Sequence, residues 1–266
     1  MFHVPCYPAP MNTMRTSDHE GGVRVLTLDR PPANAINQDF LRDLSAALDE
    51  AREDEAVRAL VIAGNGPFFC GGFDLHSEAQ SGGLLQEQAT GFRLYHESHL
   101  KLLAFPKPTI AMMNGHAIAG GTVIVLACDY RLGLDGDYRV GLNEVAIGAA
   151  FPRAAFEIVR LRLNHQQASE VLLGAQVYPA SQAVRLGIVD ELLPAERFQE
   201  TAMRRAARLG SYPREAYAHT KGMLVAQAVA RIEAETDPEM LRTAAVWVTE
   251  ESRAARAAQR AKLREG

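Results

Sequence analysis

Two pairs of adjacent glycines, each between apolar segments, constrain this chain more than any other feature of its sequence. Gly71-Gly72 interrupts FFCGGFDL (68–75), and Gly120-Gly121 interrupts NGHAIAGGTVIVLACDYR (114–131). Each pair follows a strand-like run and precedes helical sequence. Glycine permits a tight turn with an unobstructed N–H, and a helix start adds unpaired N–H groups with a partial positive charge. Two such turns that converge form an oxyanion hole. The alternative is that both are ordinary connecting turns, and the pattern alone favours that alternative because Gly-Gly pairs are common in loops.

Composition excludes several classes of protein. The 266 residues carry a net charge of −4 from 28 basic and 32 acidic side chains, so no basic field attracts nucleic acid. No apolar run reaches the length of a membrane span. The three cysteines (Cys6, Cys70 and Cys128) lack a metal-like spacing and favour a reduced, cytoplasmic setting.

The order of predicted elements indicates an α/β chain in three parts. Residues 1–16 contain three prolines and no periodic pattern, so they predict a flexible extension. Residues 17–200 predict a core with a strand-strand-helix rhythm, and residues 201–266 predict a helical region. A Rossmann fold is disfavoured because no GxGxxG follows the first strand. The individual predictions are strands over 23–28, 59–63, 108–113, 130–133 and 138–141, helices over 37–52, 87–105 and 179–186, a loop over 77–86, and a long final helix from residue 237.

Glu144 is the only acid between Asp137 and Glu157, and it lies in the small, apolar stretch VGLNEVAIG. A carboxylate in such surroundings has its pKa raised by desolvation, which suits a general base. The alternative is a glutamate near the surface that caps a helix or forms an ion pair, and the isolated residue favours that alternative.

Taken together, these segments resemble the crotonase superfamily, which contains the enoyl-CoA hydratases and isomerases. RPPANAIN (30–37) is similar to its first acyl-CoA-binding segment, and residues 183–190, AVRLGIVD, to a later element. The likeness extends from about residue 20 to the C-terminus. It implies an α/β spiral of strand-strand-helix units with a helical C-terminal region, which would make contacts in a homotrimer or hexamer.

The resemblance also implies roles for individual residues. The backbone N–H groups of Phe73 and Gly120 would hold the thioester oxygen as it becomes an enolate, and Glu144 would be the base. Asp74 would orient its loop. No metal or redox cofactor is implied, because coenzyme A is part of the substrate. The positions expected along the acyl-CoA are Ala33, Ala35, Cys70, Gly71, Asp74, Leu75, Gly121 and Val123.

At one position the chain departs from the hydratase pattern. Hydratases that resemble it carry a second glutamate three residues after the oxyanion glycine, where this chain has Val123. Adding water requires a group that holds and deprotonates it, and a valine does neither. Moving a double bond from the 3,4 to the 2,3 position needs one base in a dry pocket. The GLNE segment (141–144) resembles the single-glutamate segment of the Δ3,Δ2-enoyl-CoA isomerases, and this resemblance implies that reaction. A dienoyl-CoA isomerase is disfavoured, because the extra acid of those enzymes would fall at Pro152.

Two rival functions stay open: a hydratase or other crotonase reaction with a substitute second acid, and a non-catalytic acyl-CoA-binding protein. Several further polar side chains are candidates for the site, but their positions in loops and on helix faces favour solvated side chains. They are His76, Glu78, His96, Glu97, His99, His116, Arg253, Arg256, Arg260, Lys262 and Arg264. For His116 we expect a side chain that packs or forms a hydrogen bond.

Overall fold

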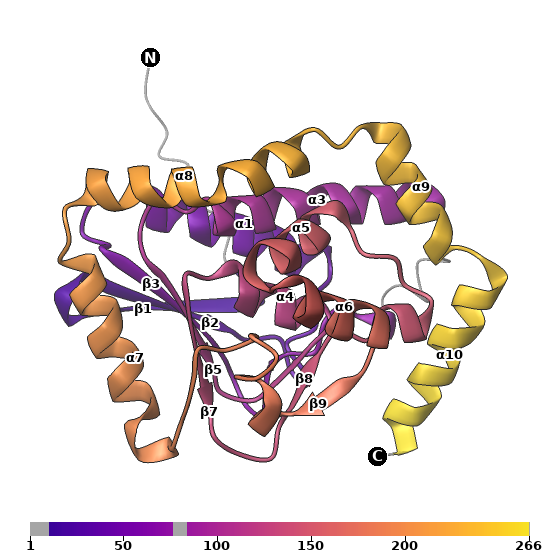
Figure 1. The fold of residues 1–266 in the computed structure, drawn as a ribbon, viewed down its shortest axis with the longest axis horizontal. Helices are drawn as coiled ribbons and strands as arrows, with labels where there is room; N and C mark the ends of the chain where they lie inside the picture. The colour runs from indigo at the N-terminus through magenta and orange to yellow at the C-terminus, as the bar shows by residue number, and fades with distance from the viewer. Residues whose placement is uncertain (1–10, 77–83, 266) are drawn as a thin grey trace.

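A computed structural model describes residues 11–76 and 84–265 of the chain, and its largest sheet has the strand order β1-β2-β3-β5-β7-β10 (Figure 1). β1 and β2 are antiparallel, and the other neighbours are parallel. The β-rich runs of the sequence form the strands buried in this sheet. Its strands are β1 (Met14–His19), β2 (Val23–Leu28), β3 (Ala59–Gly64), β5 (Thr109–Met113), β7 (Tyr130–Leu134) and β10 (Glu191–Leu193).

A second, four-stranded sheet has the order β4-β6-β8-β9. Its strands are β4 (Phe68–Cys70), β6 (His116–Ile118), β8 (Arg139–Gly141) and β9 (Val177–Pro179). Three successive turns of chain each add one strand to the large sheet, one to the small sheet and then a helix. These helices are α3 (Leu85–Leu103), α4 (Gly120–Ala127) and α5 (Arg153–Arg162). The repeat confirms the predicted α/β spiral of strand-strand-helix units.

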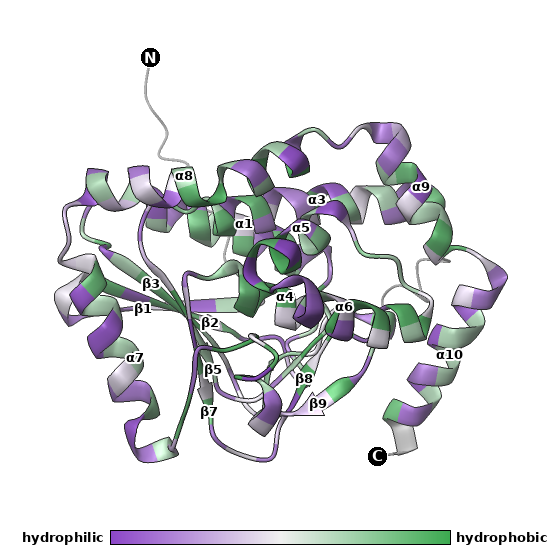
Figure 2. Ribbon diagram, in the orientation of Figure 1, coloured by the Kyte–Doolittle hydropathy of each residue, from purple (hydrophilic) through white to green (hydrophobic). Residues whose placement is uncertain are grey.

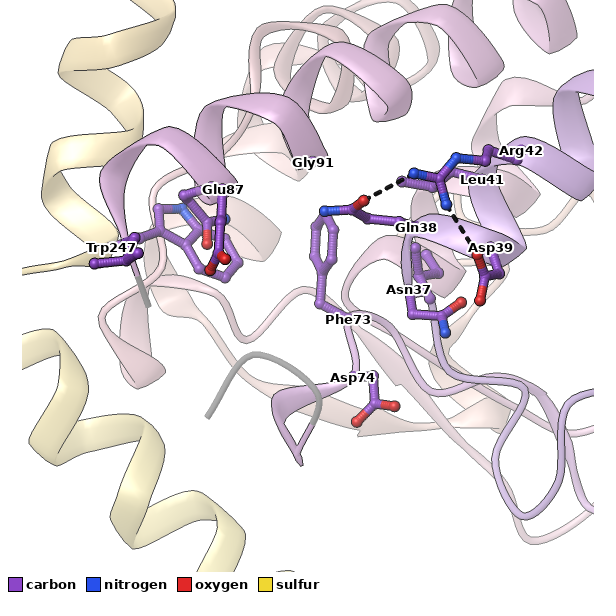
Figure 3. Close-up of a pocket in the computed structure, with 13 residues that line it drawn as sticks. Asn37, Gln38, Asp39, Leu41, Arg42, Phe73, Asp74, Glu87, Gly91 and Trp247 are labelled. Carbon is purple, nitrogen blue, oxygen red and sulfur yellow. Dashed lines mark hydrogen bonds and ion pairs between the residues drawn. The ribbon is translucent and has the colours of Figure 1, made fainter. Parts of the chain in front are cut away.

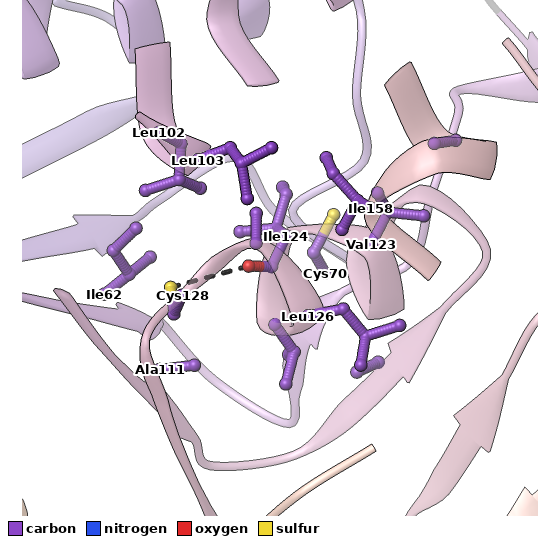
Figure 4. Packing of buried hydrophobic residues seen from close by; sticks show 14 of the residues in the cluster. Ile62, Cys70, Leu102, Leu103, Ala111, Val123, Ile124, Leu126, Cys128 and Ile158 are labelled. Atoms are coloured by element: carbon purple, nitrogen blue, oxygen red, sulfur yellow. Dashed lines mark hydrogen bonds between the residues drawn. The ribbon is translucent and has the colours of Figure 1, made fainter. Parts of the chain in front are cut away.

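Helix α4 lies at the centre of the core (Figure 4). All eight of its residues are buried, which agrees with a sequence that is apolar on every side. Helix α1 (Gln38–Glu53) packs against α3 and begins where the Asn37 side chain accepts a hydrogen bond from the Phe40 N–H at 2.8 Å. The α helices therefore enclose the Gly120-Gly121 turn from which α4 starts.

The remaining helices lie around this core. α7 (Ala195–Gly210) places Phe198, Ala202 and Leu209 against the large sheet. α6 (His165–Gly174) follows α5, and α8 (Arg214–Glu233) runs beside α3 and α5. α9 (Asp237–Trp247) and α10 (Glu250–Glu265) complete the predicted helical C-terminal region. The outer helices α7, α8 and α10 show mixed hydropathy, as expected of helices with one solvated face (Figure 2).

Three sequence predictions require correction. Met14 to Thr16, expected in a flexible extension, belong to β1, because their backbone pairs with β2; residues 1–10 lie outside the described part. Residues 179–186 form the end of β9, a 3-10 turn η3 (Ala180–Gln182) and further turns in place of a helix. The predicted final helix divides after Trp247, since Thr249 starts a new helix by accepting a hydrogen bond from the Ser252 N–H at 3.2 Å.

Two short 3-10 segments, η1 (Glu20–Gly22) and η2 (Val145–Ile147), complete the elements. Within the described residues, no helix has the length and apolarity needed to cross a membrane. The same residues contain no cluster of three or more histidine, cysteine or acidic side chains that could hold a metal ion.

Candidate active site

The two glycine turns lie backbone to backbone. A Cβ atom on Gly121 would stand 2.0 Å from the carbonyl oxygen of Cys70, and one on Gly72 would stand 2.8 Å from the Cβ of Ala119. Gly72 also has φ of +83°, a conformation that L side chains rarely adopt. Glycine is therefore required at both positions because the turns approach each other too closely for side chains.

Two unpaired N–H groups result from this approach. Gly120 is the first residue of α4, so its N–H has no partner inside the helix. Phe73 lies between two backbone hydrogen bonds that Ile36 makes with Gly72 and Asp74, and its own N–H stays unused. Within the described part of the chain, neither N–H has an acceptor. The amide nitrogen of Gly120 is 3.4 Å from the position of a Cβ on Gly72, so the predicted oxyanion donors come from adjoining turns.

Glu144 lies between β8 and η2, and its side chain is buried, with 5% of the residue exposed. Burial raises the pKa of this carboxyl to about 8. Its Oε2 is sealed from solvent and has no hydrogen-bond partner among the described residues. The side chain does not cap η2. The alternative of a surface glutamate is therefore wrong, and the carboxyl has the surroundings expected of a general base.

Val123 is fully buried inside α4 in the same apolar cluster as Cys70 and Ile158, as Figure 4 shows. No carboxylate takes the place that the second hydratase glutamate would have. Burial raises the pKa of the neighbouring Cys70 thiol to about 12, which keeps it neutral. Neither side chain can activate water, so the candidate site contains one buried acid on this side.

Tyr95 belongs to the candidate site, and sequence reasoning missed it. Its ring stacks on Phe73 with centroids 5.3 Å apart, and one ring carbon lies 3.8 Å from the position of a Cβ on Gly120. Burial and then the charge of Glu144 raise the pKa of its hydroxyl. The signal in the sequence was its place on the apolar stripe of α3, three residues after Phe92 and four before His99.

No acid for this site comes from His96, Glu97 or His99 on α3. His99 is fully buried and stacked beneath Tyr95 at 3.6 Å, and burial lowers its pKa to about 3. His96 Nδ1 lies 3.1 Å from Glu235 Oε2, and burial lowers the pKa of His96 to about 4. Glu97 pairs with Lys101 at 2.9 Å. The interpretation as a solvated face holds for Glu97 and is wrong for the two histidines, which face the protein interior.

The predicted acyl-CoA segment, residues 30–37, lies against the first glycine turn. Gly71 donates its N–H to the Ala33 carbonyl at 2.8 Å. Arg30 joins both segments, because it pairs with Asp74 at 2.6 Å and donates to the Ala35 carbonyl at 3.0 Å. The structure thus brings the predicted binding positions together, and Asp74 has the contacts of a residue that orients its loop.

A cavity of about 360 Å³ opens beside Phe73 (Figure 3). Asn37, Gln38 and Asp39 border it at the start of α1, and Trp247 borders it across from them, with Glu87 on α3. In the close-up the Phe73 ring lies between these two groups of side chains. The wall of this cavity thus includes the residue that carries one of the two unpaired N–H groups.

The remaining candidates lie elsewhere or pack internally. His116 accepts a hydrogen bond from the Arg139 N–H at 3.0 Å and packs against the Phe68 ring in a tilted contact, as predicted. His76 is exposed, and Glu78 lies outside the described residues. In the C-terminal basic run, the prediction of a solvated face is wrong for Arg256, which is 2% exposed because it hydrogen-bonds to two backbone carbonyls.

Comparison with solved structures supports the fold. The crystal structure of human mitochondrial Δ3-Δ2-enoyl-CoA isomerase is similar with a TM-score of 0.90 and 25% identity, covering 95% of this chain and 98% of that one. An enoyl-CoA isomerase from Mycobacterium tuberculosis is similar with a TM-score of 0.77 and 31% identity, covering 88% and 97%.

Comparison with curated proteins gives the same family. Human mitochondrial enoyl-CoA delta isomerase 1 is 29% identical over 231 residues, which is 84% of this chain and 74% of the relative. The 2,3-dehydroadipyl-CoA hydratase of Escherichia coli is 30% identical over 191 residues, covering 71% and 73%. The family pattern for enoyl-CoA hydratase/isomerase matches residues 18–257. With the paired glycine turns and the spiral fold, these matches show that the chain belongs to the enoyl-CoA hydratase/isomerase family of the crotonase superfamily.

Proposed function

We propose that this protein moves the double bond of a 3-enoyl-CoA thioester to the 2,3 position, with Glu144 as the only acid-base residue. One observation carries the proposal: a single sealed carboxyl with a raised pKa, at a site where Val123 stands in place of a second carboxylate. The similarity to isomerases supports the same reaction.

The proposed reaction starts with removal of the α-proton by the Glu144 carboxylate. The C–H bond at C2 breaks, and its electron pair delocalises through C3 and C4 and onto the thioester oxygen. The N–H groups of Phe73 and Gly120 stabilise that oxygen, and each such donor contributes roughly 3 kcal/mol to lowering the barrier. Glu144 then returns the proton to C4, which leaves the double bond between C2 and C3 and regenerates the carboxylate.

The surroundings of Glu144 suit this proton transfer. A base is most effective when its pKa lies near the working pH, and a value of about 8 meets that condition near neutrality. The dry, apolar wall around it, which includes Val123 and Cys70, limits competing protonation by water. No metal or redox cofactor is needed, because the thioester and the two N–H groups stabilise the negative charge.

Hydration is the second candidate, and Tyr95 is the observation that favours it. Its ring borders Phe73 and the start of α4 at Gly120, and burial raises the pKa of its hydroxyl, which stays neutral. A hydroxyl at this place could hold a water molecule for addition to a 2-enoyl-CoA, which is the substitute for the missing carboxylate that this rival requires. The third candidate is a non-catalytic acyl-CoA carrier, and this function would not explain the raised pKa of Glu144.

The test is proton exchange in heavy water with a series of 3-enoyl-, 2-enoyl- and saturated acyl-CoA thioesters. Deuterium at C2 and C4 together with the conjugated 2-enoyl product supports the isomerase. A 3-hydroxyacyl-CoA product from the 2-enoyl thioester supports the hydratase. Tight binding without any 2-enoyl or 3-hydroxyacyl product and without deuterium incorporation across several chain lengths contradicts both reactions and leaves the carrier.

A further inference from the structure

Arg256 is a buried cation on the C-terminal helix α10. It is 2% exposed, which is unusual for an arginine unless its guanidinium is fully engaged. That guanidinium donates to the carbonyl of Gly148 at 3.3 Å and to the carbonyl of Trp247, and it lies 5.2 Å from the Trp247 ring centre. Arg256 thus joins the break between α9 and α10 to the turn that follows Glu144.

This turn is held by its own backbone and by α10. Ile147 and Ala149 donate their N–H groups to the Glu144 carbonyl at 3.1 and 2.8 Å. Gly148 has φ of +68°, and a Cβ atom there would stand 2.6 Å from the Cα of Ser252. Since α10 touches the turn this closely, any shift of α10 would move the backbone that carries Glu144.

Trp247 connects the same turn to the other half of the site. Its Nε1–H donates to the Ala150 carbonyl at 2.7 Å, two residues after the carbonyl that Arg256 binds. The edge of its ring packs on Phe73 with centroids 5.4 Å apart, and Phe73 carries one of the two unpaired N–H groups. Trp247 is also the only tryptophan in the chain.

We propose that Arg256 is a positioning residue, which with Trp247 fixes the Glu144 carboxyl at its working distance from the Phe73 N–H. The inference rests on the proposed function, because it takes Glu144 as the base. Arg256 acts on the base through its hydrogen bond to the Gly148 carbonyl, and it acts on the oxyanion donor through its contact with Trp247. One cation therefore sets the geometry of both groups. A base displaced by about 1 Å loses on the order of 10²-fold in rate.

This role is geometric. The pKa of Glu144 is raised by burial, with no cation among its causes. Replacing Arg256 should therefore lower kcat without moving the midpoint of the pH profile. A residue that only held α10 in place would lower the unfolding temperature and leave the KM and kcat of the folded protein unchanged.

The experiment compares Arg256→Met and Arg256→Lys with wild type and with Lys262→Met, which removes an exposed charge from the same helix. The rate of formation of the conjugated 2-enoyl-CoA from a 3-enoyl-CoA gives kcat and KM. Amide hydrogen exchange of the peptide over 142–150 reports the turn, and exchange over 59–64 in β3 reports the core. Trp247 fluorescence reports the break between α9 and α10.

For Arg256→Met we expect kcat to fall by about 30- to 100-fold with KM within about threefold, faster exchange over 142–150 with unchanged exchange over 59–64, and an altered Trp247 emission. Arg256→Lys should restore part of the rate, and Lys262→Met should match wild type. Wild-type protection over 142–150 in Arg256→Met, or kcat within twofold of wild type, overturns the positioning role. A wild-type protein that forms no 2-enoyl product from any 3-enoyl thioester refutes the proposed function, and amide exchange then still decides whether Arg256 holds the turn.

Discussion

At the scale of single residues, the raised pKa of Glu144 makes activity and stability depend on pH in opposite directions. The base acts in its ionised form, so kcat/KM should increase with pH and level off above about 8. Glu144→Gln should lose roughly 10²- to 10⁴-fold in kcat while the dissociation constant for an acyl-CoA stays within a few-fold. Steady-state kinetics and calorimetric titration check both, and a variant with wild-type kcat would exclude Glu144 as the base.

The same residue should lower stability at high pH. Its pKa in the folded protein is about 8, above the ordinary value of 4.5 for a glutamate, so the folded state binds the proton more tightly. The stabilising effect is complete below the unfolded value and is lost as pH rises toward 8. The unfolding temperature of wild type relative to Glu144→Gln should therefore fall between pH 5 and pH 9. A constant difference between the two proteins would contradict the buried, unpartnered state of the carboxyl.

Val123 offers a second test at a single residue. Val123→Glu restores a carboxylate at the position that hydratases use, so 2-enoyl-CoA hydration should appear or increase. Because the side chain enters an apolar cluster, the unfolding free energy should fall by several kcal/mol. Product analysis of 3-hydroxyacyl-CoA measures the gain. If the folded variant shows no hydration, the missing acid is not what limits that reaction. The matched control is Val123→Gln, which adds a polar side chain without a carboxylate.

At the scale of elements, the start of α4 should tolerate no side chain. Gly121→Ala would place a Cβ atom 2.0 Å from the Cys70 carbonyl oxygen, so it should destabilise the fold by about 3 kcal/mol and separate the two oxyanion donors. Gly222→Ala is the control, since nothing lies within 4 Å of its Cβ position on α8, and it should stabilise by about 0.5–1 kcal/mol. Chemical denaturation compares the two; equal effects would disprove the close packing of the glycine turns.

Local pattern predicted most elements because their signals are contained in a few neighbouring residues. The alternating run before Leu28, the Asn37 cap and the all-apolar stretch of α4 each indicate one structure. The helix prediction for residues 179–186 was wrong because a proline and glycine spacing that is typical of a helix also fits a series of turns. Tyr95 was missed and Arg256 was wrongly interpreted as solvated, because their roles depend on contacts between α3, α9 and α10, which lie far apart in the sequence. Glu144 was found because its isolation among apolar residues is itself a local signal.

At the scale of the whole molecule, exposed apolar side chains on α8 fit the predicted trimer or hexamer. Met223 and Leu224 are adjacent and 69% and 64% exposed, although α8 packs its other face on the core through Val225 and Ala228. An exposed apolar patch of this kind is expected to be covered by a partner. We therefore expect the protein to elute as an assembly of three or six chains, with these two residues at a contact between them.

Met223→Lys with Leu224→Lys tests this assembly. Burying two added charges at a contact is strongly unfavourable, so light scattering should show smaller species, and the double variant should keep its helical circular dichroism because neither side chain belongs to the core. Gln199→Lys, an exposed change on the separate helix α7, is the control and should assemble as wild type. Full-size assembly of the double variant would place the contact elsewhere. A dissociated variant that still exchanges the α-proton would show that each chain contains a complete site, as the interactions of Tyr95 with Phe73, with Gly120 and with the charge of Glu144 within one chain lead us to expect.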